Sequence, residues 1–415
     1  MKVKSMFLAL GLMLTSTTTL ALSSQDVINS YTDLAFNVYT DSLAEAKKLQ
    51  ADIQKFLDSP SPETLAQARY AWRQARVPYM QTEAFRFGNP VVDNIDGQVN
   101  SWPLDEGFLD YVSSDYEGEL GNSGATAFIL SLDTLRLGAN EIDVSELTPE
   151  LLASLNELGG SEANIATGYH AIEFLLWGQD LNGTDPGAGN RPYTDYLAGE
   201  GCSHQYCQRR RDYLTAVTTL LVNDLNYLVG QWQAGDSNNY RAKFVKLAPQ
   251  EALTRILFGI GSLAFGELAG ERMQVALEAN SPEDEQDCFS DNTVFAHYYD
   301  WQGIANVYLG EYKRVDGSFY KGDSLADLVA ERNNGLAQKM QHQISQTHAA
   351  LQALVNAYQD PNNPMAFDQM IAEGNVEGAA LINQIIAELA ATTELIEGVA
   401  KTLGITNLNP NLDAG

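Results

Sequence analysis

Residues 167–180 read TGYHAIEFLLWGQD, and this stretch decides both the fold and the candidate site. Apolar residues fill the segment between two glycines, which predicts a buried helix. Residues three apart on a helix project from the same side, so we expect His170 and Glu173 to be neighbours. A lone buried carboxylate is costly unless it is paired, and a bound cation is the simplest partner for a neutral imidazole and a carboxylate. The segment therefore predicts a metal site.

A plainer interpretation of the same pair stays open. His170 and Glu173 could hydrogen-bond only to each other or to a nearby arginine, because the pattern is just two residues deep. The apolar surroundings of His170 favour the metal hypothesis. The chain contains five histidines, at positions 170, 204, 297, 342 and 348.

Helical periodicity dominates the rest of the chain, and no segment alternates convincingly as a strand. Two helix starts are well marked, since Ser61 precedes Pro62 and Pro249 opens another apolar run. We therefore predict an all-α protein built from two antiparallel helical-bundle domains, residues 24–195 and 196–415, with long ordered loops. The predicted helices cover residues 25–57, 62–87, 161–177, 208–233, 249–279, 324–358 and 375–403.

The N-terminus predicts export. Lys2 and Lys4 precede a short apolar run and then small residues, which is typical of a signal peptide spanning residues 1–23. We expect a periplasmic protein, with secretion as the alternative. No later stretch has the ~18 uninterrupted apolar residues of a membrane span, so the protein is not expected to cross a membrane. The net charge of −29 argues against nucleic acid as a partner and favours cations.

The cysteines are three, an odd number in an oxidising compartment. Cys202 and Cys207 are close enough in sequence to close a small loop by a disulfide, which leaves Cys288 free. A zinc site that uses both thiols and His204 is the alternative, although it lacks a fourth ligand nearby in the sequence.

A second stripe lies on the predicted helix over residues 62–87. One face mixes aromatic side chains with a carboxylate between two arginines, as expected of a lined pocket. An Arg–Glu network that ties helices together explains the same pattern. The pocket-lining candidates are Trp72, Arg76, Tyr79 and Arg86, with Glu83 between the two arginines.

Acidic residues follow this helix in the next loop, at positions 93, 96, 105, 106 and 110. If the loop folds over His170 and Glu173, its oxygen ligands would complete a site for a hard or borderline cation. Asp96 is the first choice, because the adjacent Gly97 permits a close approach.

Four segments together make the chain similar to the imelysin family, also called peptidase family M75, and within it to the iron-regulated protein A branch. The segment over residues 168–178 carries the family's G-x-H-x-x-E motif. Relatives often have histidines at the positions of Gln286 and Val294, which leaves His297 three residues further on. The segments are WRQARVPYMQTEAFR (72–86), GYHAIEFLLWG (168–178), GELAGERM (266–273) and EDEQDCFSDNT (283–293).

The resemblance implies two related helical bundles, a signal peptide and a site near the domain interface that contains His170 and Glu173, with Glu83 as the best match for a further ligand. It also implies a role in iron supply, in uptake or in sensing, with a membrane iron-uptake complex as a candidate partner. Iron is the favoured metal and zinc is the alternative.

The peptidase alternative meets a chemical difficulty. An inverted zinc-protease motif supplies a second imidazole directly after the glutamate, whereas Phe174 stands there in this chain. A His and a Glu three apart in a bundle resemble the ligands of iron-binding bundles instead, with their order reversed. We therefore favour a metal-binding protein over a metallopeptidase. A haem-binding role, with Tyr79, Tyr169 and His170 around a porphyrin, or a structural role in a membrane complex is a further alternative.

Overall fold

The structure is a computed structural model that describes residues 21–410. Long helices form nearly all of its regular structure. This confirms the all-α prediction. The predicted signal peptide falls, apart from its last residues, outside the described range. The first part of the chain comprises α1 (Ser24–Asp58), α2 (Pro62–Thr82), η1 (Glu83–Phe85), α3 (Pro90–Val99), α4 (Glu106–Leu109), η2 (Ile129–Ser131), α5 (Pro149–Leu155), η3 (Leu158–Gly160), α6 (Gly168–Trp177), η4 (Tyr193–Tyr196), η5 (Gly199–Gly201) and α7 (Cys207–Trp232).

The remaining helices follow α7 along the chain. Within them, η6 is a π-helical continuation of α9, so that α9, η6 and α10 run on as one rod. The helices are α8 (Tyr240–Phe244), α9 (Pro249–Gly261), η6 (Ser262–Gln274), α10 (Val275–Ala279), η7 (Pro282–Asp284), η8 (Cys288–Ser290), α11 (Thr293–Leu309), α12 (Leu325–Arg332), α13 (Asn334–Tyr358), α14 (Phe367–Ile371) and α15 (Val376–Thr402).

The first two helices begin where the sequence predicts them. Ser23 caps α1 in a capping box with Asp26, and Ser61 caps α2 together with Thr64, directly before Pro62. These side chains satisfy backbone N–H groups that the first helical turn leaves without partners.

Six α-helices and two hairpins lie outside the predicted helices, and α11 (residues 293–309) is the longest of these helices. The helix α11 was missed because it is buried on nearly all sides, which removes the amphipathic period. The helix α3 is short and acidic. The antiparallel pairs β1 (Thr134–Leu137) with β2 (Asn140–Asp143) and β3 (Glu311–Lys313) with β4 (Phe319–Lys321) are too short for alternation to be visible.

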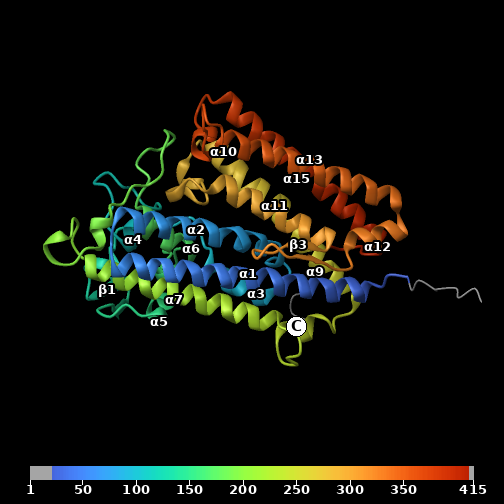
Figure 1. Ribbon diagram of the computed structural model, residues 1–415, viewed down its shortest axis with the longest axis horizontal. Helices are drawn as coiled ribbons and strands as arrows, with labels where there is room; N and C mark the ends of the chain where they lie inside the picture. The colour runs from blue at the N-terminus through green and yellow to red at the C-terminus, as the bar shows by residue number, and fades with distance from the viewer. Residues whose placement is uncertain (1–20, 411–415) are drawn as a thin grey trace, which may run out of the picture.

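The helices pack in two groups that share α11 (Figure 1). In one group α1 packs against α2 and α7, and in the other α13 packs against α15, which also contacts η6. The helix α11 contacts α2 on one side and α13 on the other. The helix α7 lies after the predicted domain boundary at 195/196 but packs against α1. The division into two domains therefore stays a prediction.

Among the described residues, two helical rods are long and apolar enough to span a membrane by length and composition. Pro249–Ala279 is 67% buried over its most apolar window and Val376–Thr402 is 28% buried. Burial of the first within the protein is the ordinary reason for such composition in a core helix. That the chain does not span a membrane stays a prediction.

Candidate metal centre

The helix α6 places His170 and Glu173 inside the protein, because all ten of its residues are buried. Gly168 begins the helix with a φ of +78°, and a Cβ atom at this position would collide with the carbonyl oxygen of Val99. Gly178 ends the helix with a φ of +72°. Both positions favour glycine, since other residues rarely adopt a positive φ. The glycines of the motif thus fix the depth and the end of the helix that carries the two ligands.

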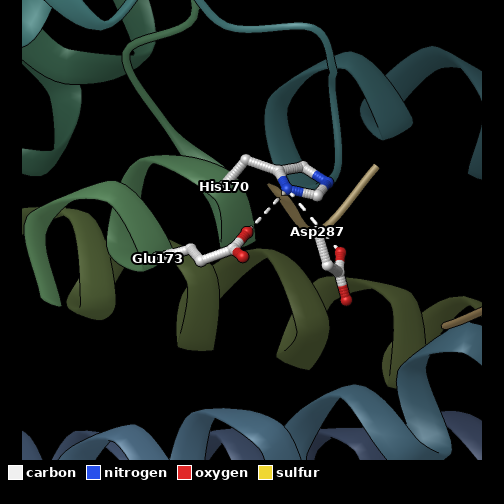
Figure 2. Close-up of side chains that lie close together, drawn as sticks. All are labelled: His170, Glu173 and Asp287. Carbon is white, nitrogen blue, oxygen red and sulfur yellow. Dashed lines mark hydrogen bonds and ion pairs between the residues drawn. The ribbon is translucent and has the colours of Figure 1, made fainter. Parts of the chain in front are cut away.

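His170 and Glu173 meet a third candidate ligand, Asp287, from the segment between η7 and η8 (Figure 2). The Nδ1 atom of His170 lies 3.1 Å from Glu173 Oε2 and 3.8 Å from Asp287 Oδ1. One ligand atom from each residue can be chosen so that all three lie within 4.8 Å of one another. The three side chains are at most 1% exposed. We call them the triad; among the described residues they are the only His, Cys, Asp or Glu cluster of this kind.

Hydrogen bonds hold both carboxylates of the triad in place. Glu173 Oε1 accepts from the backbone N–H of Ser290 at 3.0 Å and from its hydroxyl at 2.6 Å. Asp287 accepts from Arg76 Nη2 at 2.7 Å and from Asn292 Nδ2 at 2.8 Å. Such supporting contacts orient ligands before an ion arrives.

The charges around the triad differ between its members. Burial raises the pKa of Glu173 well above its usual range, and the nearby Asp287 raises it further. Burial also opposes ionisation of Asp287, but the guanidinium of Arg76 holds the pKa of Asp287 below its usual range. Burial and Arg76 lower the pKa of His170 to about 3. These directions favour a neutral imidazole, an ionised Asp287 and a protonated Glu173 in the metal-free site.

This donor set fits a transition-metal ion. The triad offers one imidazole and two carboxyl groups, which are ligands common to zinc and non-haem iron sites. The Nε2 atom of His170 is buried and has no hydrogen-bond partner in the metal-free protein. A bound cation would replace the Glu173 proton and balance the negative charge of the ionised Glu173 carboxylate.

The predicted ligands Glu83 and Asp96 lie in a different cluster, which we call the arginine network. Arg272 Nη2 donates to Glu83 Oε2 at 2.8 Å and Arg86 Nη1 lies 3.0 Å from Asp96 Oδ2. Arg272 also pairs with Glu267 at 2.9 Å, five residues earlier, a spacing that the π-helical turn of η6 brings onto one face. The structure does not bring Glu83 or Asp96 to the triad. Their contacts favour the Arg–Glu network that explained the same sequence pattern.

The predicted pocket-lining residues divide between the two clusters. Arg76 belongs to the triad's surroundings, and Arg86 belongs to the arginine network. Trp72 is buried and donates to the backbone oxygen of Tyr169, whose ring packs against Tyr79 with centroids 4.6 Å apart. These aromatic side chains hold α2 against α6.

The loop acids that the sequence grouped together are not part of the triad. Asp110 pairs with Arg191 and Arg210 at 2.7 and 2.6 Å, and Asp93 lies 3.2 Å from Arg86.

Cys202 and Cys207 are joined by a disulfide, and Cys288 is free.

Asp287 is the site residue that sequence reasoning missed. Its segment is acid-rich and was part of the family resemblance, but several neighbouring carboxyl groups competed for the role. Only the fold distinguishes Asp287 from Glu283, Asp284 and Glu285, because it turns this side chain toward His170 (Figure 2).

A family model described as Imelysin, peptidase M75, matches residues 35–396. The chain belongs to the imelysin family. It is similar to iron-regulated protein A of Synechococcus elongatus, with 24% identity over 346 residues that cover 81% of this chain and 77% of the relative.

Two solved structures share the imelysin fold with this chain. One is described as a putative iron-regulated protein A precursor from Parabacteroides distasonis, with a TM-score of 0.61, 18% identity and coverage of 93% of this chain and 97% of the other. The other is an imelysin-like protein from Psychrobacter arcticum, with a TM-score of 0.61, 15% identity and coverage of 93% and 98%. At this identity the likeness establishes the fold.

Proposed function

We propose that this imelysin-family protein binds a metal ion at the triad of His170, Glu173 and Asp287, and that it serves iron uptake or iron sensing in the periplasm. The observation that carries the proposal is the buried triad itself. One ligand atom from each of the three side chains lies within 4.8 Å of the other two, at a buried position where water does not solvate a charge.

The charge balance of the site supports a cation. Arg76 neutralises Asp287, which leaves Glu173 to be neutralised by a proton or by a metal ion. A divalent or trivalent ion bound at the triad would displace the proton of Glu173 and gain an ionised carboxylate. Binding should therefore release a proton and tighten as the pH rises.

Iron is the favoured metal for two reasons. Imidazole and carboxylate ligands suit iron, and the relatives in Synechococcus elongatus and Parabacteroides distasonis are described as iron-regulated proteins. Zinc accepts the same ligands and is the alternative. The periplasmic location rests on the features of residues 1–23, and immunodetection in osmotic-shock fractions tests it.

Peptidase activity is the second candidate, because the family model carries the name peptidase M75. The geometry favours binding over hydrolysis. A polypeptide must reach a catalytic metal directly, whereas the triad is at most 1% exposed. Glu173 is also held by Ser290 as a ligand would be, which leaves it poorly placed as a general base.

Metal titration of the purified protein tests the proposal. The protein is stripped with a chelator and titrated separately with Fe(II) under anaerobic conditions, Fe(III) as its citrate complex, and Zn(II). We expect tight binding of about one iron ion per chain and no cleavage of an unfolded substrate such as casein. Casein cleavage by the zinc-loaded protein that is lost in His170→Ala would establish the peptidase instead.

A further inference from the structure

The helix α11 carries a buried histidine, His297, whose ring has no hydrogen-bond partner. His297 has no exposed surface, and neither its Nδ1 nor its Nε2 atom has a hydrogen-bond partner. A neutral imidazole carries one donor and one acceptor, and burying either group without a partner is destabilising. Among the described histidines, only His170 and His297 are buried. Each has at least one ring nitrogen that lacks a hydrogen-bond partner.

His297 lies on the face of α11 that is turned toward the triad. Four residues before it, Thr293 Oγ1 accepts a hydrogen bond from the backbone N–H of Asp287 at 2.9 Å. Residues four apart share one helix face and are separated by about 6 Å along the axis. The backbone of His297 therefore stands about one turn from a direct contact with the third ligand of the triad.

The next residue on this face contacts the arginine network. Asp300 Oδ2 accepts from Arg272 Nη1 at 2.6 Å, and the same Arg272 nitrogen lies 3.3 Å from Gln286 Oε1. Gln286 precedes Asp287 in the chain. On this face of α11, His297 lies between Thr293, which contacts Asp287, and Asp300, which shares Arg272 with Gln286.

The surroundings keep the His297 ring neutral and positioned. Burial, assisted by Arg272 and opposed by Asp287, lowers the pKa of His297 to about 3. The ring of Phe367 meets the imidazole edge-on with centroids 4.8 Å apart. A neutral imidazole is the form that coordinates metal ions.

We propose that His297 supplies a second imidazole to the cation held by His170, Glu173 and Asp287. This inference deepens the proposed function and rests on it. His297 lies outside the group whose ligand atoms come within 4.8 Å of one another, so its side chain must turn toward Asp287 when the ion binds. Two imidazoles and two carboxylates then give the four protein ligands of a closed metal site. The second imidazole that Phe174 excludes from α6 would come from α11.

Counting the coordinated imidazoles tests the proposal. The protein is loaded with one equivalent of Cu(II) as a spectroscopic probe, and pulsed electron paramagnetic resonance counts the histidine rings bound to it. We expect two rings in the unmodified protein, one in His297→Gln, and two in the control His342→Gln, which changes an exposed histidine. Zn(II) affinity measured by calorimetry should fall at least tenfold in His297→Gln and stay unchanged in His342→Gln.

A count of one ring in the unmodified protein, lost in His170→Ala, would overturn the role of His297 and leave the triad standing. The count in the unmodified protein decides the question even if His297→Gln does not fold. Metal binding that His170→Ala leaves unchanged would instead contradict the proposed function itself.

Discussion

Arg76 of α2 donates a hydrogen bond of 2.7 Å to Asp287, and both side chains are at most 1% exposed. The contact joins a helix of the first group to the segment that leads into α11. It also fixes the third ligand of the triad beside His170. One buried ion pair therefore connects the packing of the two helix groups with the geometry of the candidate metal centre.

Asp287→Asn should weaken both the fold and the site. The change leaves the Arg76 guanidinium buried without its countercharge, and breaking a buried ion pair on one side costs about 3–5 kcal/mol. We expect a lower melting temperature for the metal-free protein and at least tenfold weaker metal binding. Thermal melts followed by circular dichroism, set beside calorimetric titrations, measure both. An unchanged affinity in a folded variant would remove Asp287 from the ligand set.

His170→Ala and Glu173→Ala should each weaken metal binding by at least an order of magnitude, because each removes a ligand. The helical content should stay unchanged, since α6 is held by its packing. Equilibrium dialysis with metal analysis measures the affinity, and far-ultraviolet circular dichroism checks the fold. Binding equal to that of the parent protein in both variants would place the site elsewhere.

Glu83→Gln separates a ligand from a member of the arginine network. Glu83 accepts from Arg272 at 2.8 Å, while Glu267 and Asp300 remain as countercharges, so removal of the Glu83 charge should destabilise the metal-free protein by about 1–3 kcal/mol. Metal affinity at the triad should stay within threefold of the parent value. Denaturant unfolding and metal titration on the same sample check this. A large loss of affinity with little loss of stability would make Glu83 a ligand, as the family resemblance implied.

Glu106→Gln should change how stability depends on pH. Burial, with Glu283 adding to it, raises the pKa of Glu106 from 4.5 to about 8. Between these values the folded state binds more protons than the unfolded state, so this group lowers the free energy of unfolding as the pH rises. The substitution should add on the order of 1–3 kcal/mol of stability at pH 8 and little at pH 4.

The hydrogen bond to Glu106 is retained in this variant, because an amide oxygen can still accept from Gln179, which lies 2.7 Å away. Urea unfolding at several pH values compares the two proteins. A constant difference in stability across this range would show that the Glu106 side chain does not titrate there.

Amphipathic period and helix caps made most of the fold predictable. The helices α1 and α2 start at capped positions that are visible in the sequence, and their apolar faces repeat at the helical period. The helix α11 escaped detection for the opposite reason, since burial on nearly all sides leaves no polar face. It is also the helix that joins the two groups.

The candidate site was predictable only where its ligands are local. His170 and Glu173 share one helix, so their spacing reveals them, whereas Asp287 lies 117 residues after His170 and meets it only through the packing of the two groups. The stripe from Trp72 to Arg86 carried two interpretations. The partners that separate them, Arg272 and Asp287, come from distant segments that a local pattern does not contain.

The position of the bound ion tests the central claim most directly. A crystal of the iron-loaded protein, measured on both sides of the iron absorption edge, locates the ion by anomalous diffraction without any assumption about its ligands. We predict one strong peak inside the protein, about 2.0–2.2 Å from a ring nitrogen of His170 and from carboxylate oxygens of Glu173 and Asp287. A fully loaded crystal whose strongest iron peak lies elsewhere, with the triad free of metal, would contradict it.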